Sequence, residues 1–299
     1  MRSIVVVVGY VAAGLAAIAA GVFAFAWFGS EARRNRVISV NVAPIAVATS
    51  PADIARGHYL YETRGCQQCH GANGAGRVVI DEGGLLVRAP NITPAVGTAT
   101  SFFGPLDWVR LLRHGVKPDG RPALIMPSEE YARMTDREIG QLIGYVLSLP
   151  AVEGQTAEIQ LPLTAQLLYA VGYMTDAAAR IDHDAPAPAP IEPAVTRAYG
   201  DHVADICRNC HNAALSGGPI PLAPGDWPEA ANLTPGEGGV MARYADAGAF
   251  AAMLKSGNRP DGTPIEIMPF GMLKKLDETD VAALHLFLTN LPARKTGEL

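Results

Sequence analysis

The sequence contains two short stretches of one pattern, Cys66-Gln-Gln-Cys69-His70 and Cys207-Arg-Asn-Cys210-His211. They include all four cysteines of the 299-residue chain, and each Cys-x-x-Cys pair is followed directly by a histidine. In a helix, residues three apart lie about one turn from each other, so both thiols of a pair reach the same neighbouring group. The pattern therefore predicts two sites of one chemical kind, one in each half of the chain.

Cys-x-x-Cys-His is the attachment pattern of haem c. The two thiols form thioethers with the porphyrin, and the adjacent imidazole becomes an axial ligand of the iron. We therefore predict two covalently bound haem c groups, with His70 and His211 as ligands to iron. The alternatives are a redox disulfide and a zinc site. Structural zinc sites usually combine two such pairs close together, or one pair with two histidines, and a disulfide would leave the repeated histidine unexplained.

The second half of the sequence repeats the first. Asn91-Ile-Thr-Pro94 recurs as Asn232-Leu-Thr-Pro235, at the same offset along the chain as the cysteine pairs. Residues 115–127 recur as residues 257–269, one further position along, with eight identities in thirteen positions. Solenoid units are about 20–50 residues long. A repeat that takes up nearly half of the chain is too long for such a unit and indicates two copies of one small domain.

One methionine occupies a matched position in each repeat. Met126 and Met268 follow His70 and His211 at spacings that differ by a single position, and each precedes a proline at the end of a loop rich in Gly and Pro. Core packing is the alternative role for a methionine, but it would not require matched positions. We therefore predict Met126 and Met268 as the second ligands to iron. His plus Met ligation raises the reduction potential, and an iron with both positions filled favours electron relay over catalysis.

Helical patterns dominate the chain, and no convincing strand alternation is present. The helical patterns cover residues 51–61 (running into Cys66), 106–114, 135–149, 195–206, 247–254 and 278–291. The sequence therefore predicts an all-α fold. We divide it into an anchor (1–30), a spacer (31–50), a first domain (51–150), a linker (151–194) and a second domain (195–299). The linker has a short apolar helical pattern within residues 161–179 and a proline-rich stretch at 185–190.

The N-terminal segment is long enough to cross a membrane. Residues 4–28 carry no charge, and a helix rising about 1.5 Å per residue spans a hydrocarbon core of about 30 Å with roughly 20 residues. A cleaved secretory signal is the alternative, but its apolar stretch is usually about 7–15 residues. We expect a single-pass anchor in a bacterial inner membrane. Haem attachment takes place on the outer face, so we place the haem domains in the periplasm, although the arginines at 33, 34 and 36 favour the opposite orientation.

The chain resembles class I cytochrome c domains. It is similar to the membrane-bound dihaem and trihaem cytochrome c subunits that accept electrons from periplasmic dehydrogenases. The resemblance rests on Cys-x-x-Cys-His-Gly at 66–71, Asn-Ile-Thr-Pro at 91–94, Met-Pro at 126–127 and Thr-Asp-x-Glu-Ile at 135–139. It implies a compact helical domain around each haem, with His/Met ligation and one-electron transfer. With the N-terminal segment, we therefore predict a transmembrane helix followed by two tandem cytochrome c domains. The second copy departs at Asn212, which stands in place of Gly71.

These features predict a dihaem cytochrome of a respiratory chain. It would relay single electrons from a membrane quinol-oxidising complex or a dehydrogenase to a terminal acceptor such as an oxidase or a soluble cytochrome. One alternative is a structural or electron-entry subunit of a larger oxidase or dehydrogenase complex. Another is a dihaem peroxidase, which would need one haem without a strong sixth ligand. A net charge of −5 argues against nucleic acid as a partner.

Overall fold

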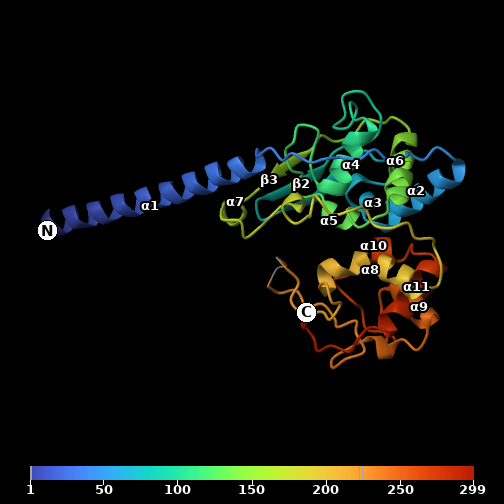
Figure 1. Cartoon of the computed structure of the whole chain (residues 1–299). Helices are drawn as coiled ribbons and strands as arrows, with labels where there is room; N and C mark the ends of the chain where they lie inside the picture. The colour runs from blue at the N-terminus through green and yellow to red at the C-terminus, as the bar shows by residue number, and fades with distance from the viewer. Residues whose placement is uncertain (1, 222, 224) are drawn as a thin grey trace.

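The computed structural model describes residues 2–221, 223 and 225–299 of the chain. Residues 1, 222 and 224, which belong to the predicted anchor and the predicted second domain, lie outside the described residues. Figure 1 shows one long helix, α1 (Arg2–Arg34), projecting away from two helical halves that lie against each other. Among the described residues, α1 is the one helix long and apolar enough to cross a membrane.

The first half surrounds its own cluster of buried apolar side chains. Its helices are α2 (Pro51–Thr63), α3 (Cys66–His70), α4 (Pro105–His114), α5 (Ser128–Tyr131) and α6 (Asp136–Ser148). Helix α6 begins with a capping box, in which Thr135 and Glu138 each bond to the other's backbone N–H. The cluster beneath these helices includes Leu60, Trp108 and Ile139.

The second half has a separate buried cluster. Its elements are α8 (Arg197–His211), the 3₁₀ turn η2 (Met241–Arg243), α9 (Ala247–Ser256), α10 (Phe270–Leu273) and α11 (Glu278–Thr289). The cluster includes Tyr199, Met241 and Leu284. The mostly helical prediction is therefore confirmed. Helix α8 runs straight through the second Cys-x-x-Cys-His, whereas in the first half a break at Gly65 separates α2 from α3.

The prediction of an all-α fold is wrong in one respect, because the first half contains a small antiparallel sheet. Strands β1 (Arg77–Glu82) and β2 (Leu85–Ala89) form a hairpin, and β3 (Glu158–Gln160) pairs with the other edge of β2. The hairpin turns on Gly83 and Gly84, which both have positive φ. A Gly-Gly pair between two runs of apolar residues is a hairpin signal. Apolar side chains occupy both faces of this hairpin, so no alternation revealed it.

The segments flanking the first half pack onto it and onto α1. The predicted spacer (31–50) begins too early, because α1 continues to Arg34. The rest of it is extended from residue 36 and hydrogen-bonds to the first half, through Ile38 N to Gly120 O at 2.9 Å and Ala48 N to Gly140 O at 3.1 Å. The apolar helix expected within residues 161–179 is present as α7 (Leu163–Ala170), followed by η1 (Ala177–Ala179). Arg33 at the end of α1 donates to Ala170 O at 3.1 Å.

Helices α2 and α6 cross so closely at Gly57 that no side chain fits between them. A Cβ atom added at Gly57 would lie 2.0 Å from the Gln141 carbonyl oxygen, so the helices would have to move apart. We expect Gly57→Ala to lower the free energy of unfolding by about 1–3 kcal/mol, as other overpacked substitutions do. That loss outweighs the gain of about 1 kcal/mol in helix propensity.

Denaturant unfolding of the full chain measures this change. The matched control is Gly225→Ala, where an added Cβ has nothing within 4 Å. Equal stability of Gly57→Ala and the parent protein would show that the helices separate without cost.

Candidate functional site

The first Cys-x-x-Cys-His forms a single helical turn. Gly65, at φ 83°, lets the chain bend between α2 and α3, and Gly71, at φ 75°, ends the turn. The Cys66 thiol is buried and the Cys69 thiol is half-buried, on the same short helix as His70. The turn therefore places two thiols and one imidazole on one compact element of the first half.

The two predicted histidine ligands are oriented in the same way. His70 Nδ1 lies 2.9 Å from the Pro90 carbonyl oxygen, and His211 Nδ1 lies 2.7 Å from the Ala231 carbonyl oxygen. A carbonyl only accepts hydrogen bonds, so Nδ1 carries the proton and Nε2 keeps its lone pair. Burial lowers the pKa of both imidazoles, which favours this neutral form. A second partner that fixes the tautomer is typical of metal-binding histidines.

Equivalent hydrogen bonds surround His70 and His211. His70 O and His211 O accept from Gly76 N and Gly217 N, at 2.9 and 3.0 Å. The side chain of each matched asparagine accepts a hydrogen bond from the backbone N–H two residues later. Thr93 N donates to Asn91 Oδ1 at 2.8 Å, and Thr234 N donates to Asn232 Oδ1 at 2.9 Å. The Asn-x-Thr-Pro motif therefore shapes the loop that supplies the carbonyl to each histidine.

The second copy keeps this backbone without the first copy's glycine. Asn212 stands in place of Gly71 and has φ 61° and ψ 173°, against 75° and 168° in the first copy. Its side chain accepts from Ala214 N at 2.9 Å and donates to Ser216 Oγ at 2.8 Å. With ψ at 173°, Asn212 lies outside the left-handed helical region and in one populated almost only by glycine, so its backbone is strained and its side-chain hydrogen bonds help to hold it. The departure seen in the sequence therefore leaves the local geometry of the second motif unchanged.

Met126 and Met268 lie in loops of the same shape. Each is half-buried and packs against the apolar cluster of its own half. The proline after each has nearly equal dihedral angles, φ −80° and ψ 62° at Pro127 and φ −78° and ψ 60° at Pro269. A one-turn helix follows in both, α5 or α10, and its first N–H bonds back to the methionine carbonyl.

The four cysteines are free thiols, and no pair of them forms a disulfide. Burial raises the pKa of Cys66 and of Cys207 to about 12. Within the described residues, no group of three or more His, Cys, Asp and Glu side chains is arranged to hold a metal ion. The arrangement thus lacks the four-ligand set that a structural zinc site needs.

A buried indole tests whether the first site fits a haem. Trp108 is 5% exposed and belongs to the same cluster as Cys66, yet its Nε1–H has no hydrogen-bond partner. Buried indole N–H groups usually have a partner. A haem carries two carboxylates that accept hydrogen bonds, so an unpaired donor in the same buried cluster as Cys66 fits this group.

The histidines outside the two motifs have polar partners of their own. His285 bonds to the Tyr244 carbonyl at 3.0 Å, and His114 and His183 contact each other at 3.2 Å. His58 lies near Glu62 on the surface of α2.

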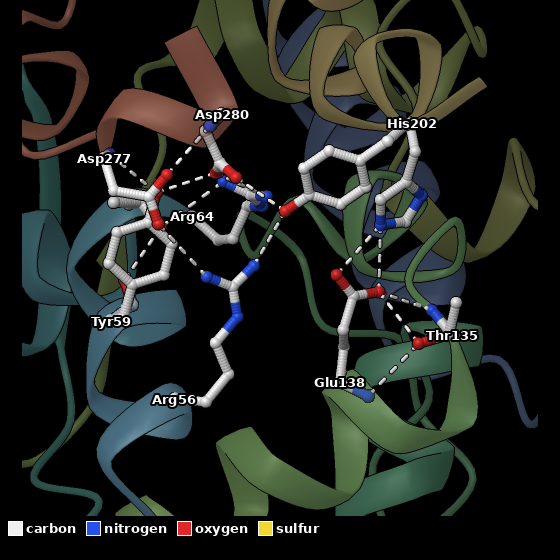
Figure 2. A network of polar contacts seen from close by, with 10 residues as sticks. Arg56, Tyr59, Arg64, Thr135, Glu138, His202, Asp277 and Asp280 are labelled. Carbon is white, nitrogen blue, oxygen red and sulfur yellow. Dashed lines mark hydrogen bonds and ion pairs between the residues drawn. The ribbon is translucent and has the colours of Figure 1, made fainter. Parts of the chain in front are cut away.

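Sequence reasoning missed a buried polar network between the two halves (Figure 2). At its centre is Asp280, which is fully buried at the start of α11. Its carboxylate accepts from Tyr59 at 2.7 Å and from Tyr199 at 2.6 Å, and the Arg64 guanidinium lies 3.8 Å away. Arg56 donates to the Tyr199 hydroxyl at 2.9 Å.

A second carboxylate stands on the other side of this network. His202 Nε2 lies 2.9 Å from Glu138 Oε1, and Glu138 also accepts from Thr135 N at 2.9 Å. Burial would raise the pKa of Glu138, but the hydrogen bond and charge of His202 outweigh it and lower the pKa to about 2. The one sequence signal for this network is that Glu138 and Asp280 occupy matched positions in the repeat.

Comparison with known proteins identifies the first half. Residues 52–146 match the family described as "Cytochrome C oxidase, cbb3-type, subunit III". The chain is also similar to the fructose dehydrogenase cytochrome subunit of Gluconobacter japonicus, at 26% identity over 288 residues, which cover 84% of this chain and 55% of the relative. The chain therefore spans about half the length of the curated relative that it matches. Residues 52–146 therefore form a cytochrome c domain, and the chain has distant similarity to a dehydrogenase cytochrome subunit.

Proposed function

We propose that this chain, whose first half is a cytochrome c domain, binds one haem c in each half and relays single electrons between redox proteins at a membrane. Cys66 and Cys69 would attach the first haem, and His70 and Met126 would ligate its iron. The residues with the same roles in the second half are, in the same order, Cys207, Cys210, His211 and Met268.

One observation carries the proposal for the second site. The hydrogen bond from the motif histidine to a carbonyl twenty residues later is present in both halves, on His70 and on His211. The similarity to the dehydrogenase cytochrome subunit gives independent support. It covers 84% of this chain, so it extends well beyond residues 52–146 and into the second half.

The chain's own residues account for what such a relay needs. A bound haem c supplies a one-electron iron couple. The carbonyls of Pro90 and Ala231 hold each imidazole with Nε2 free to coordinate. The loops ending in Pro127 and Pro269 present a neutral thioether, which stabilises the ferrous state. The two apolar clusters keep water away, another means by which proteins tune a haem's potential.

The long apolar helix and the relative suggest the setting. We propose that α1 anchors the chain in a bacterial inner membrane and that both halves lie in the periplasm. The relative is the cytochrome subunit of a fructose dehydrogenase. By analogy, a dehydrogenase or a quinol-oxidising complex would donate electrons here, and an oxidase or a soluble cytochrome would accept them.

Haem content and redox titration test this function. The full chain, produced in cells that attach haem c and purified in mild detergent, should carry two haems per polypeptide. An anaerobic titration should show two one-electron steps, both at the high potentials of His/Met ligation. A single haem per chain would refute the dihaem relay, and rapid turnover of peroxide by the reduced protein would favour the peroxidase instead.

A further inference from the structure

Two contacts across the halves join matched positions of the repeat. The Tyr59 hydroxyl donates to Asp280 Oδ2 at 2.7 Å, and His202 Nε2 contacts Glu138 Oε1 at 2.9 Å. Glu138 and Asp280 each lie three residues after the N-cap of the last helix of their half. One half therefore contributes Tyr59 where the other contributes His202, and each of these side chains meets the matched carboxylate of the opposite half.

The helix positions of Tyr59 and His202 are also equivalent. Each lies two residues after a glycine whose added Cβ would meet a carbonyl of the last helix, at 2.0 Å for Gly57 and at 2.1 Å for Gly200. A contact in which position i meets j while j meets i is the mark of a two-fold, self-complementary interface. The two halves thus meet through one surface that is used twice.

The attachment motifs follow the same reciprocal rule. The Gln67 side chain accepts a hydrogen bond at 3.1 Å from Lys275, which lies two residues after the end of α10. The neighbouring Gln68 amide lies against α10 itself, since a Cβ added at Gly271 would be 3.1 Å from it. In the other direction, Asn209 of the second motif hydrogen-bonds to Glu130 in α5. Each motif therefore lies against the short helix that follows the methionine loop of the other half.

Burial makes this interface costly to open. Asp280 is fully buried, and Glu138 and Arg64 are each 7% exposed. Separating the halves would remove the hydrogen bonds and ion pairs that these groups make with the other half. Removing one partner of a buried ion pair is strongly destabilising. Domains joined by a linker otherwise move relative to each other unless their interface is substantial.

We propose that the two halves dock through this surface, and that Asp280 and Glu138 are positioning residues that hold the two haem groups at one fixed separation. This rests on the proposed dihaem function. Electrons then pass between the haems inside the chain, one iron being oxidised and the other reduced by one electron, with no bond made or broken. Each methionine loop leads directly into α5 or α10, the short helix that lies against the attachment motif of the other haem.

The test uses the full-length holoprotein and a double variant, Tyr59→Phe with Glu138→Gln. Phenylalanine keeps the ring beneath Arg56, and glutamine keeps the capping box of α6, so the helices themselves are spared. Two quantities are measured: the yield of a carbodiimide cross-link between Lys275 and Glu62, which form an ion pair across the halves, and the rate of electron transfer between the haems after flash photoreduction. The matched control is Glu237→Gln, which removes an ion pair with Lys295 whose two side chains are exposed.

In the parent protein and in the control, we expect efficient cross-linking and rapid transfer. The double variant should lower the equilibrium constant between docked and separated halves about tenfold, which corresponds to about 1.4 kcal/mol. Cross-link yield and transfer rate should then both fall below the parental values while both haem spectra stay unchanged. Parental cross-linking and rate in the double variant would overturn the proposal. The cross-link reports docking whether or not both haems are attached, so a chain with one haem refutes the proposed function without deciding this one.

Discussion

Replacing Cys207 and Cys210 with alanine should lower the haem content of the protein from two per chain to one. Both thioether bonds of the second site are lost, and Met268 and His211 alone are then left to hold a free haem. The remaining haem should keep the spectrum and the potential of the first site, because the first cluster is separate from the second. Pyridine haemochrome absorbance per polypeptide, with the intact mass of the chain, measures this.

The matched variant, Cys66→Ala with Cys69→Ala, should remove the other haem and leave the second. Each double variant leaves the other site intact. The haem that remains therefore shows that the chain still folds, and the missing haem reports attachment alone. Two haems retained after the Cys207 and Cys210 changes would mean that the second motif is not an attachment site.

Met126→His should lower the reduction potential of the first haem by on the order of 100 mV, within the range of about 0.8 V that axial ligands set. An imidazole stabilises the ferric state relative to the neutral thioether, so the shift is downward. Met268→His should lower the potential of the other haem in the same way. Anaerobic spectroelectrochemical titration resolves the two steps, and the charge-transfer absorbance band of the methionine–iron bond should disappear from the altered site.

The control for these variants is Met134→Leu. Met134 is 4% exposed in the same cluster as Met126, and a swap of similar volume usually costs less than about 1.5 kcal/mol. We expect both potentials to remain at their parental values. A potential unmoved by Met126→His would show that another group completes the first site.

The helices around the sites were accessible to sequence reasoning because their signals are local. The helical pattern over residues 135–149 lies within the element that it predicts, and α6 (Asp136–Ser148) begins and ends within one residue of it. The sheet was missed because its strands come from two segments that are far apart in the sequence. Only the Gly83–Gly84 turn is local, while β3 comes from a distant segment, beyond the whole of the first domain, which the sequence indicated only as linker.

By itself, the sequence was enough to predict which residues carry the chemistry of this protein. The two Cys-x-x-Cys-His motifs, and the two methionines that the repeat places at matched positions, need only spacing to be recognised. The tertiary structure decided how the two halves meet. Tyr59 and Asp280 lie in different halves of the chain, and the sequence around either residue does not indicate a contact with the other. A hydrogen bond between such residues depends on the packed faces of two folded units, so it exists only once both halves have formed their own cores.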